Sequence, residues 1–271
     1  MQNELKQAIR FDDFYALFGD KGVVTMAWWL GGQLAESIRE EQDSFPLLHL
    51  CGGPESCKAI LVQYLSKLTG PGSMTHLSLC HSTRTSRIQA IRDSTNRVLV
   101  HEFDQAPAPD FCWDDLKAHY NSATYFTHTG EDTGAVNFKG AVMIRSNAEW
   151  ECSEAVASRL VRLDLKAPPY TGYRQAHEVF KLRAEQAGAF GRAITLNRDK
   201  LLKDILGLAS IYTAVLLRGY AGPLTAREAK NGGQLLALIE AVNLLLGLSH
   251  KQRCAAVREV ISSISNDFIR F

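Results

Sequence analysis

A lysine that follows a glycine-rich turn is the first group in this sequence that could do chemistry. Leu47–Thr69 reads LLHLCGGPESCKAILVQYLSKLT: an apolar run, a turn, and a helix-like run that contains the lysine. Backbone N–H groups of such a turn and the positive end of the following helix bind phosphate, and the lysine reaches the outer phosphates. The candidate phosphate-binding residues are Gly52, Gly53, Pro54, Glu55, Ser56, Cys57, Lys58 and Ala59.

The turn departs from the phosphate-loop pattern at two positions. That pattern has glycine, four residues, a second glycine, lysine, and then serine or threonine. Cys57 replaces the second glycine, and Ala59 replaces the hydroxyl residue that normally ligates Mg²⁺. By itself, the stretch is explained equally well by an ordinary strand, turn and helix.

Three later segments carry further polar side chains at points where chemistry is possible. Glu102 and Asp104 follow the apolar run in RVLVHEFD, and Asn147 closes the run in FKGAVMIRSN. Arg159 and Arg162 lie in SEAVASRLVRLDL. Each has a plainer explanation, namely a solvated acidic strand end, a turn-forming asparagine and solvated surface arginines.

The elements that must position these groups alternate between strand and helix up to about residue 165. The pattern predicts a helix over Val23–Glu41, where Gly31 and Gly32 permit close packing, and another over Ser86–Asp93. The expected strands after the first are Thr75–Cys80, Arg97–Phe103, Phe138–Ser146 and Val161–Leu165. This alternation favours an α/β fold with a largely parallel sheet, and the chain after the Pro168–Pro169 pair is almost wholly helical. We therefore expect an N-terminal helical segment (1–44), a core (45–167) and a helical C-terminal domain (168–271).

Composition sets broad limits on function. The 271 residues are 46% hydrophobic, enough for one large core or two smaller ones, and the net charge of +1 excludes a globally basic nucleic-acid binder but not a local patch. The six cysteines show no CxxC pair or zinc spacing, so we expect reduced thiols, most of them small buried hydrophobes. The sequence shows no signal peptide and no full-length apolar span, which favours a cytoplasmic protein without membrane contact.

The four segments, in this order, resemble the AAA+-like ATPase domain of superfamily 3 helicases. The closest kind is the helicase-like part of primase-helicase proteins encoded by phages, plasmids and integrative elements. The resemblance covers roughly Phe45 to Leu165, a little under half of the chain. It implies a P-loop NTPase sheet flanked by helices that binds ATP and Mg²⁺ at the subunit interfaces of a ring, usually a hexamer. It also implies movement along DNA, expected to be single-stranded, and a primase or polymerase as a possible partner.

The resemblance also assigns roles to the polar residues. Lys58 would hold phosphate, Glu102 would polarise the attacking water, and Asp104 is a weak candidate for a metal ligand. Asn147 would sense the γ-phosphate, and Arg159 or Arg162 would act in a neighbouring subunit's site.

DNA contact is expected at a β-hairpin. The segment Thr129–Gly140 (TGEDTGAVNFKG) has hairpin turn chemistry, and in these ATPases a hairpin at this place projects into the central channel. Candidate DNA-contacting residues are Lys139, His128, Arg84, Arg87 and Arg92.

Three departures leave the activity open: Cys57, Ala59, and His101 at the position before Glu102, where an aspartate is usual. The domain is then an ATPase with a rearranged metal shell, a protein that binds nucleotide without turnover, or a pseudo-ATPase that serves as an assembly or DNA-binding platform. A metabolic P-loop kinase is disfavoured, because no acceptor-binding signature is visible and the long helical tail is unexplained by it.

Overall fold

Five parallel strands form the central sheet of the computed structural model, which describes residues 2–94, 97–103, 107–121, 124–129, 132–148, 150–168, 172–219 and 224–264. Their order across the sheet is β2 (Met74–Ser78), β3 (Val98–Phe103), β6 (Ala141–Ser146), β1 (Leu47–Cys51) and β7 (Leu160–Asp164). β1 is buried along its whole length, because both faces of a parallel sheet are covered, and this explains its apolar sequence. The expected α/β parallel sheet is confirmed.

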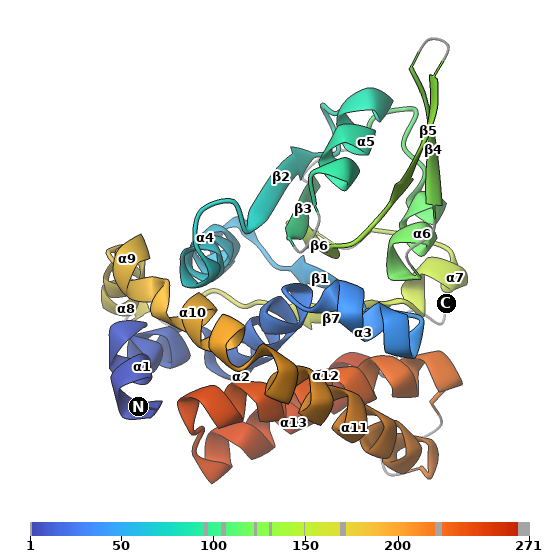
Figure 1. Ribbon diagram of the computed structural model, residues 1–271. Coiled ribbons are helices and arrows are strands. Elements are labelled where there is room, and N and C mark those ends of the chain that lie inside the picture. Colours follow the sequence, from blue (N-terminus) through green and yellow to red (C-terminus); the bar gives the residue numbers. More distant parts are fainter. Residues whose placement is uncertain are drawn as a thin grey trace.

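The larger core lies on one face of this sheet, beneath helices from both ends of the chain (Figure 1). α2 (Phe11–Gly32) and α4 (Lys58–Thr69) contribute to it, and α12 (Ala226–Leu246) packs against α2. Trp28 and Trp29 of α2 are fully buried there, and side chains of this size dominate the energetics of a core. The N-terminal helices, the sheet and the C-terminal helices therefore share one continuous core.

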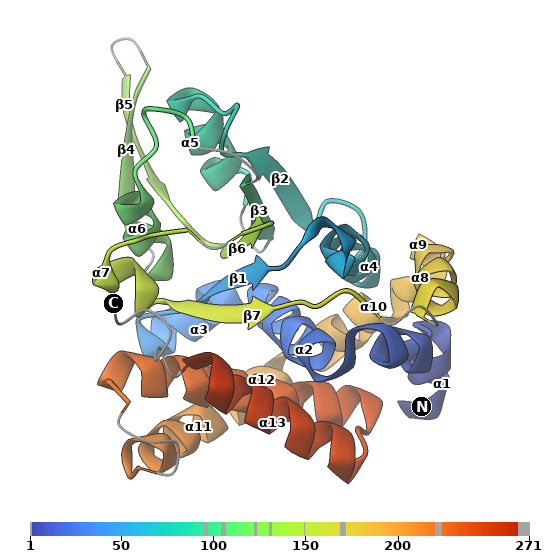
Figure 2. The ribbon, with the colours of Figure 1, turned by 180° about the vertical axis from the view of Figure 1, so that it is seen from behind.

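The smaller core lies on the opposite face of the sheet, on the side where Figure 2 shows α5, α6 and α7. Its helices are α5 (Arg84–Arg92), α6 (Leu116–Tyr120) and α7 (Glu154–Ala157), with the short 3₁₀ turn η2 (Trp113–Asp115) before α6. α5 begins where Thr83 caps the helix by accepting a hydrogen bond from the backbone N–H of its third residue.

An antiparallel pair of strands projects away from the sheet past α5 (Figures 1 and 2). β4 (Thr124–Thr129) pairs with β5 (Asp132–Asn137), and the first and last residues of the pair are joined by a side-chain hydrogen bond of 2.7 Å. The expected hairpin is present, but its first strand precedes the segment in which the sequence placed it.

Helices follow β7 for the rest of the described chain. They are α8 (Gly172–Phe180), α9 (Ala184–Ala187), α10 (Ala189–Leu196), α11 (Arg198–Leu217), α12 and α13 (His250–Ile264). α12 starts with a reciprocal capping box between Thr225 and Glu228 and ends at Gly247, whose left-handed φ of 63° is typical of a helix C-terminus. The helical C-terminal region expected from the sequence is confirmed.

Two local expectations were wrong. The helix expected over residues 23–41 is two helices, because α2 ends at Gly32 and α3 (Ala35–Gln42) begins after a short break; α1 (Gln2–Ala8) precedes both. Gly31 does allow close packing, since a Cβ there would lie 2.6 Å from the Leu238 side chain. None of the six cysteines forms a disulfide, but only Cys51 is buried, so burial does not explain most of them. Within the described part of the chain, no helix has the length and apolar content to cross a bilayer.

Candidate nucleotide-binding site

The loop between β1 and α4 has backbone conformations that its glycines permit. Gly52 adopts a φ of 154°, and a Cβ there would lie 2.2 Å from the Leu165 carbonyl oxygen, so only glycine fits. The 3₁₀ turn η1 (Pro54–Ser56) follows, and Cys57 then adopts the left-handed conformation with a φ of 59°. Cysteine thus occupies the position that glycine prefers, with a local strain of about 1–2 kcal/mol.

α4 begins directly after this turn without a side-chain cap. The Cys57 side chain makes no capping hydrogen bond to the helix. The first N–H groups of a helix have no partner within it, and together with the helix dipole they favour an anion. α4 is twelve residues long, and Lys58 is its first residue. The N-terminus of this helix and Lys58 therefore face the same loop.

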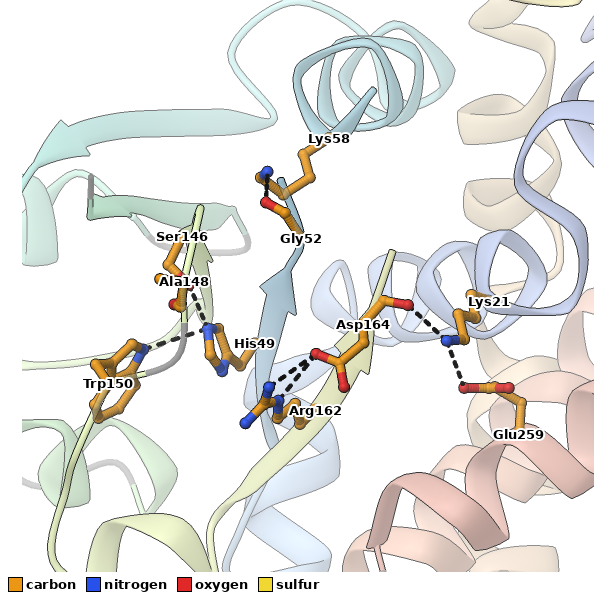
Figure 3. Close-up of polar contacts among 10 residues, drawn as sticks. All are labelled: Lys21, His49, Gly52, Lys58, Ser146, Ala148, Trp150, Arg162, Asp164 and Glu259. Atoms are coloured by element: carbon orange, nitrogen blue, oxygen red, sulfur yellow. Dashed lines mark hydrogen bonds and ion pairs between the residues drawn. The ribbon is translucent and has the colours of Figure 1, made fainter. Parts of the chain in front are cut away.

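The Lys58 amine turns into the loop, as Figure 3 shows for its contact with the Gly52 carbonyl. It also donates to the Gly53 carbonyl at 2.9 Å and to Asn147 Oδ1 at 3.0 Å, and it is only 6% exposed. The side chain of Ser56 lies 3.2 Å from the same nitrogen. Because neutral oxygens surround the amine, it must exchange some of these contacts before it can reach a phosphate.

Asn147 comes to this lysine because of the strand order. β6 lies next to β1, and residues after parallel strands meet at one edge of the sheet. Leu50 pairs with Arg145 and Cys51 with Ser146, so the chain leaves both strands at the same level. Two residues singled out from separate sequence segments, Lys58 and Asn147, are thus in direct contact.

Glu102 lies near the end of β3, but other groups hold its carboxylate. It forms an ion pair with Arg145 of β6, and its second oxygen lies 2.9 Å from His76 Nε2 on β2. Burial, and then the charge of Arg145, lower the pKa of His76, so this contact is a hydrogen bond from a neutral imidazole at neutral pH. A carboxylate held in this way is not poised to polarise water. Asp104 lies outside the described residues.

A polar network beside the loop was not expected from the sequence (Figure 3). His49 Nε2 lies 2.7 Å from Ser146 Oγ and 3.3 Å from Trp150 Nε1. Burial, and then the charge of Arg162, lower the pKa of His49 to about 3, so the imidazole is neutral at physiological pH. The signal in the sequence was the lone histidine inside an otherwise apolar strand.

The two arginine candidates have partners within this chain. Arg159 donates to the Ala155 carbonyl and lies over the ring of Tyr120, and Arg162 on β7 bonds to Asp164 at 3.0 Å. A role in a neighbouring subunit's site would require either guanidinium to leave these contacts, and both roles stay predictions.

The ammonium group of Lys21 joins the end of β7 to α13 (Figure 3). Lys21 donates to the Asp164 carbonyl at 2.5 Å and lies 3.7 Å from a carboxylate oxygen of Glu259 on α13.

The DNA candidates come from β4, from α5 and from the chain just after β5. His128 lies on β4, and Arg84 is an exposed residue at the start of α5. Lys139 forms an ion pair of 2.6 Å with Glu36, and Arg87 is buried with its guanidinium 2.8 Å from Asp110. Arg92, also exposed, ends α5. Arg84 is thus better placed than Arg87 to meet a DNA phosphate, and these roles stay predictions.

The loop combines three features that favour an anion, and it lacks one usual Mg²⁺ ligand. The glycine turn, the uncapped helix start and the buried lysine together suit an anion. Ala59 supplies no oxygen, and in the described ranges no three acidic, histidine or cysteine side chains are grouped to hold a metal ion. The loop therefore lacks the hydroxyl that normally ligates Mg²⁺ at this position.

No model of a known protein family matches this sequence, and no curated protein matches it. Among solved structures, the chain is similar to one described as "SCCmec type IV Cch - active helicase", with a TM-score of 0.62 and 11% sequence identity. The chain thus shares the fold of that structure, a parallel sheet flanked by helices and followed by a helical region. The match covers 96% of this chain and 50% of that protein, so the chain spans half the length of that structure.

Proposed function

We propose that the chain is a helicase-like domain that binds a nucleoside triphosphate, ATP, in the loop between β1 and α4. The single observation that carries this proposal is the contact between Lys58 and Asn147 across two adjacent parallel strands. It brings a cation, an amide and an uncapped helix start to one place, which is the combination that phosphate recognition requires. Asn147 would then bind the outer phosphate that Lys58 attracts.

The wider proposal follows the resemblance to superfamily 3 helicases of mobile genetic elements. ATP binding in a homo-oligomeric ring, a hexamer in most relatives of this kind, would be coupled to single-stranded DNA held by the β4–β5 hairpin and Arg84. A primase or polymerase is the expected partner, and the cytoplasm the expected location. The helicase fold and the projecting hairpin support this proposal.

A second candidate is a pseudo-ATPase that serves as a platform for assembly or DNA binding. The observation that favours it is the carboxylate of Glu102, which is paired with Arg145 and His76 instead of being available to water. Ala59, which supplies no hydroxyl for Mg²⁺, points the same way. This candidate keeps ATP and DNA binding open but excludes turnover.

Calorimetric titration with ATP tests the binding step, with and without Mg²⁺. Lys58→Ala should weaken binding at least tenfold, which corresponds to about 1.4 kcal/mol. Lys67→Ala is the matched control, because Lys67 lies on the same helix and bonds to the distant Phe180 carbonyl. Equal binding by the wild type and Lys58→Ala, or no binding by the wild type, would sink the proposal.

Phosphate release with and without single-stranded DNA then separates the two candidates. DNA-stimulated release supports the active helicase-like domain, whereas ATP binding without release supports the platform. Electron microscopy with and without DNA tests the ring directly, because an occupied central channel is visible in projection.

A further inference from the structure

The outer face of α11 is apolar and exposed. Residues 205–217, ILGLASIYTAVLL, carry no charged side chain. Ala209 and Leu216 are buried against the rest of the protein, whereas Ile211 is 58% exposed and Val215 is 36% exposed. Both views show α11 at the edge of the molecule (Figures 1 and 2). A contiguous exposed apolar face of this kind is typical of an interaction surface.

This face is a stripe with one charge at each end. Asp204, Leu208, Ile211, Val215 and Arg218 follow one another at intervals of four and three residues, so they lie along one side of the helix. Asp204 and Arg218 are exposed, and within the described part of the chain neither forms an ion pair. Ile211 lies in the middle, about two helical turns from each charge. Such a stripe is complementary to a second copy of itself that runs in the opposite direction.

Antiparallel pairing about a two-fold axis at Ile211 satisfies both charges. The axis brings Asp204 of each copy opposite Arg218 of the other, because the two residues are equally far from Ile211 in the sequence. It also brings Val215 opposite Gly207, where a Cβ would meet nothing within 4 Å, so there is open space for a branched side chain. Parallel pairing would instead place acid against acid and base against base.

The surface beside Asp204 also has room for an arginine side chain. A hollow of about 210 Å³ lies between α11 and α12, and Asp204, Leu208 and Leu244 are among the residues that line it. An arginine covers apolar surface with its methylene stem while its guanidinium pairs with a carboxylate. Leu208 and Leu244 would therefore contact the stem of Arg218 from the second copy, and Asp204 would bind its guanidinium.

We propose that the outer face of α11 is a homodimer interface, in which two copies of the chain pair antiparallel and form two ion pairs between Asp204 and Arg218. The face lies away from α4, so the contact does not depend on nucleotide, and its two-fold symmetry distinguishes it from the head-to-tail contact of a ring (Figures 1 and 2). One helix face is small beside the roughly 1,000 Å² that stable interfaces bury, so the dimer is weak by itself. Where several copies are already assembled, several such contacts act together.

Sedimentation velocity of the full chain without nucleotide, over a wide range of protein concentration, measures this association. The wild type should show a concentration-dependent equilibrium between monomer and dimer. Ile211→Asp places two carboxylates together at the axis and should weaken the dimer by about a hundredfold. Leu196→Asp, at an 84% exposed leucine on α10, is the matched control and should associate like the wild type. A wild type that stays monomeric at every concentration, or Ile211→Asp that associates like the wild type, would overturn the proposal.

Two charge variants test the antiparallel direction. Asp204→Arg has an arginine at both ends of the stripe, and Arg218→Asp has an aspartate at both ends. Each variant repels its own copy and should dimerise about tenfold more weakly than the wild type. When they are mixed, the two variants are complementary and should form a heterodimer as tight as the wild-type dimer. Wild-type association of either variant alone, or a mixture that recovers nothing, would refute this pairing.

Thermal unfolding and ATP titration of the same variants separate this interface from the fold and from the nucleotide site. Ile211→Asp changes an exposed position, so the monomer should keep the wild-type Tm and the wild-type affinity for ATP. A less stable Ile211→Asp monomer would show that another part of the chain covers this face, and would overturn the proposal. Lys58→Ala should dimerise like the wild type, so a failure of the proposed ATP site leaves the dimer interface intact.

Discussion

Acidification should unfold this protein well above the pH at which carboxylates titrate. His49, His101 and His119 are all buried, and burial is the main cause that lowers the pKa of each from 6.5 to about 3. The unfolded chain takes up their protons as the pH falls through 6.5, whereas the folded chain takes them up only near pH 3. Folding stability is therefore lost as the pH falls within this window, and it is fully present above pH 6.5.

The size of the loss follows from the two pKa values. At pH 5, a histidine with a pKa of 6.5 when unfolded and about 3 when folded destabilises the protein by about 2 kcal/mol. The three together amount to about 6 kcal/mol, which is comparable to the whole free energy of unfolding of many domains, about 5–15 kcal/mol. The ring neighbours do not reverse this effect: Arg162 acts on His49 and Arg39 on His119 in the same direction, although Asp164 partly opposes it for His49.

Urea unfolding at pH 7, 6 and 5, followed by circular dichroism, measures this dependence. His101→Leu removes one of the three groups and should reduce the loss between pH 7 and pH 5 by about one third, that is by about 2 kcal/mol. His250→Gln, at an exposed histidine that opens α13, is the control. A wild-type stability that is the same at pH 5 and pH 7, or a His101→Leu slope equal to that of the wild type, would refute the reasoning.

Four other substitutions test the packing and the loop. Gly233→Ala should destabilise the protein by about 1–3 kcal/mol, because the new Cβ would lie 2.7 Å from the Ala209 carbonyl oxygen. Gly207→Ala meets nothing within 4 Å and should stabilise α11 by up to about 1 kcal/mol. Thermal unfolding compares the two variants. Cys57→Gly should stabilise the fold by about 1 kcal/mol, since it relieves a left-handed φ of 59°, and should tighten ATP binding in calorimetry; a weaker binder contradicts the phosphate-loop interpretation. Arg39→Met should cost about 3 kcal/mol in urea unfolding, because the buried guanidinium donates to two backbone carbonyls, and a neutral result would contradict this.

The sheet and the position of the lysine could be predicted from the sequence, because the signals there are local. An apolar run followed by Gly52 and Gly53 predicts a strand and a turn, and the alternation of strands with helices predicts a parallel sheet. In a parallel sheet, strand ends gather at one edge, so Asn147 could be expected near Lys58. The contact between them follows from that rule and the strand order.

The partners of Glu102 could not be predicted in the same way. Its contacts with Arg145 and His76 depend on which residues face each other across three strands, and strand register is fixed by packing of the whole sheet. The network of His49 and Trp150 likewise joins positions about one hundred residues apart. The break between α2 and α3 could not be predicted, because the apolar spacing continues across it.

The continuous core described above limits how this protein can be rearranged by recombination. Trp28 on α2 and Leu238 on α12 belong to the same buried cluster as the inner strands of the sheet, although they are two hundred residues apart in the sequence. A gene fusion that transferred only the sheet and the loop between β1 and α4 would expose one face of the sheet to solvent. That face is a large apolar patch and would promote aggregation. The smallest part of the chain that could be transferred as a folded unit therefore includes helices that precede β1 and helices that follow β7.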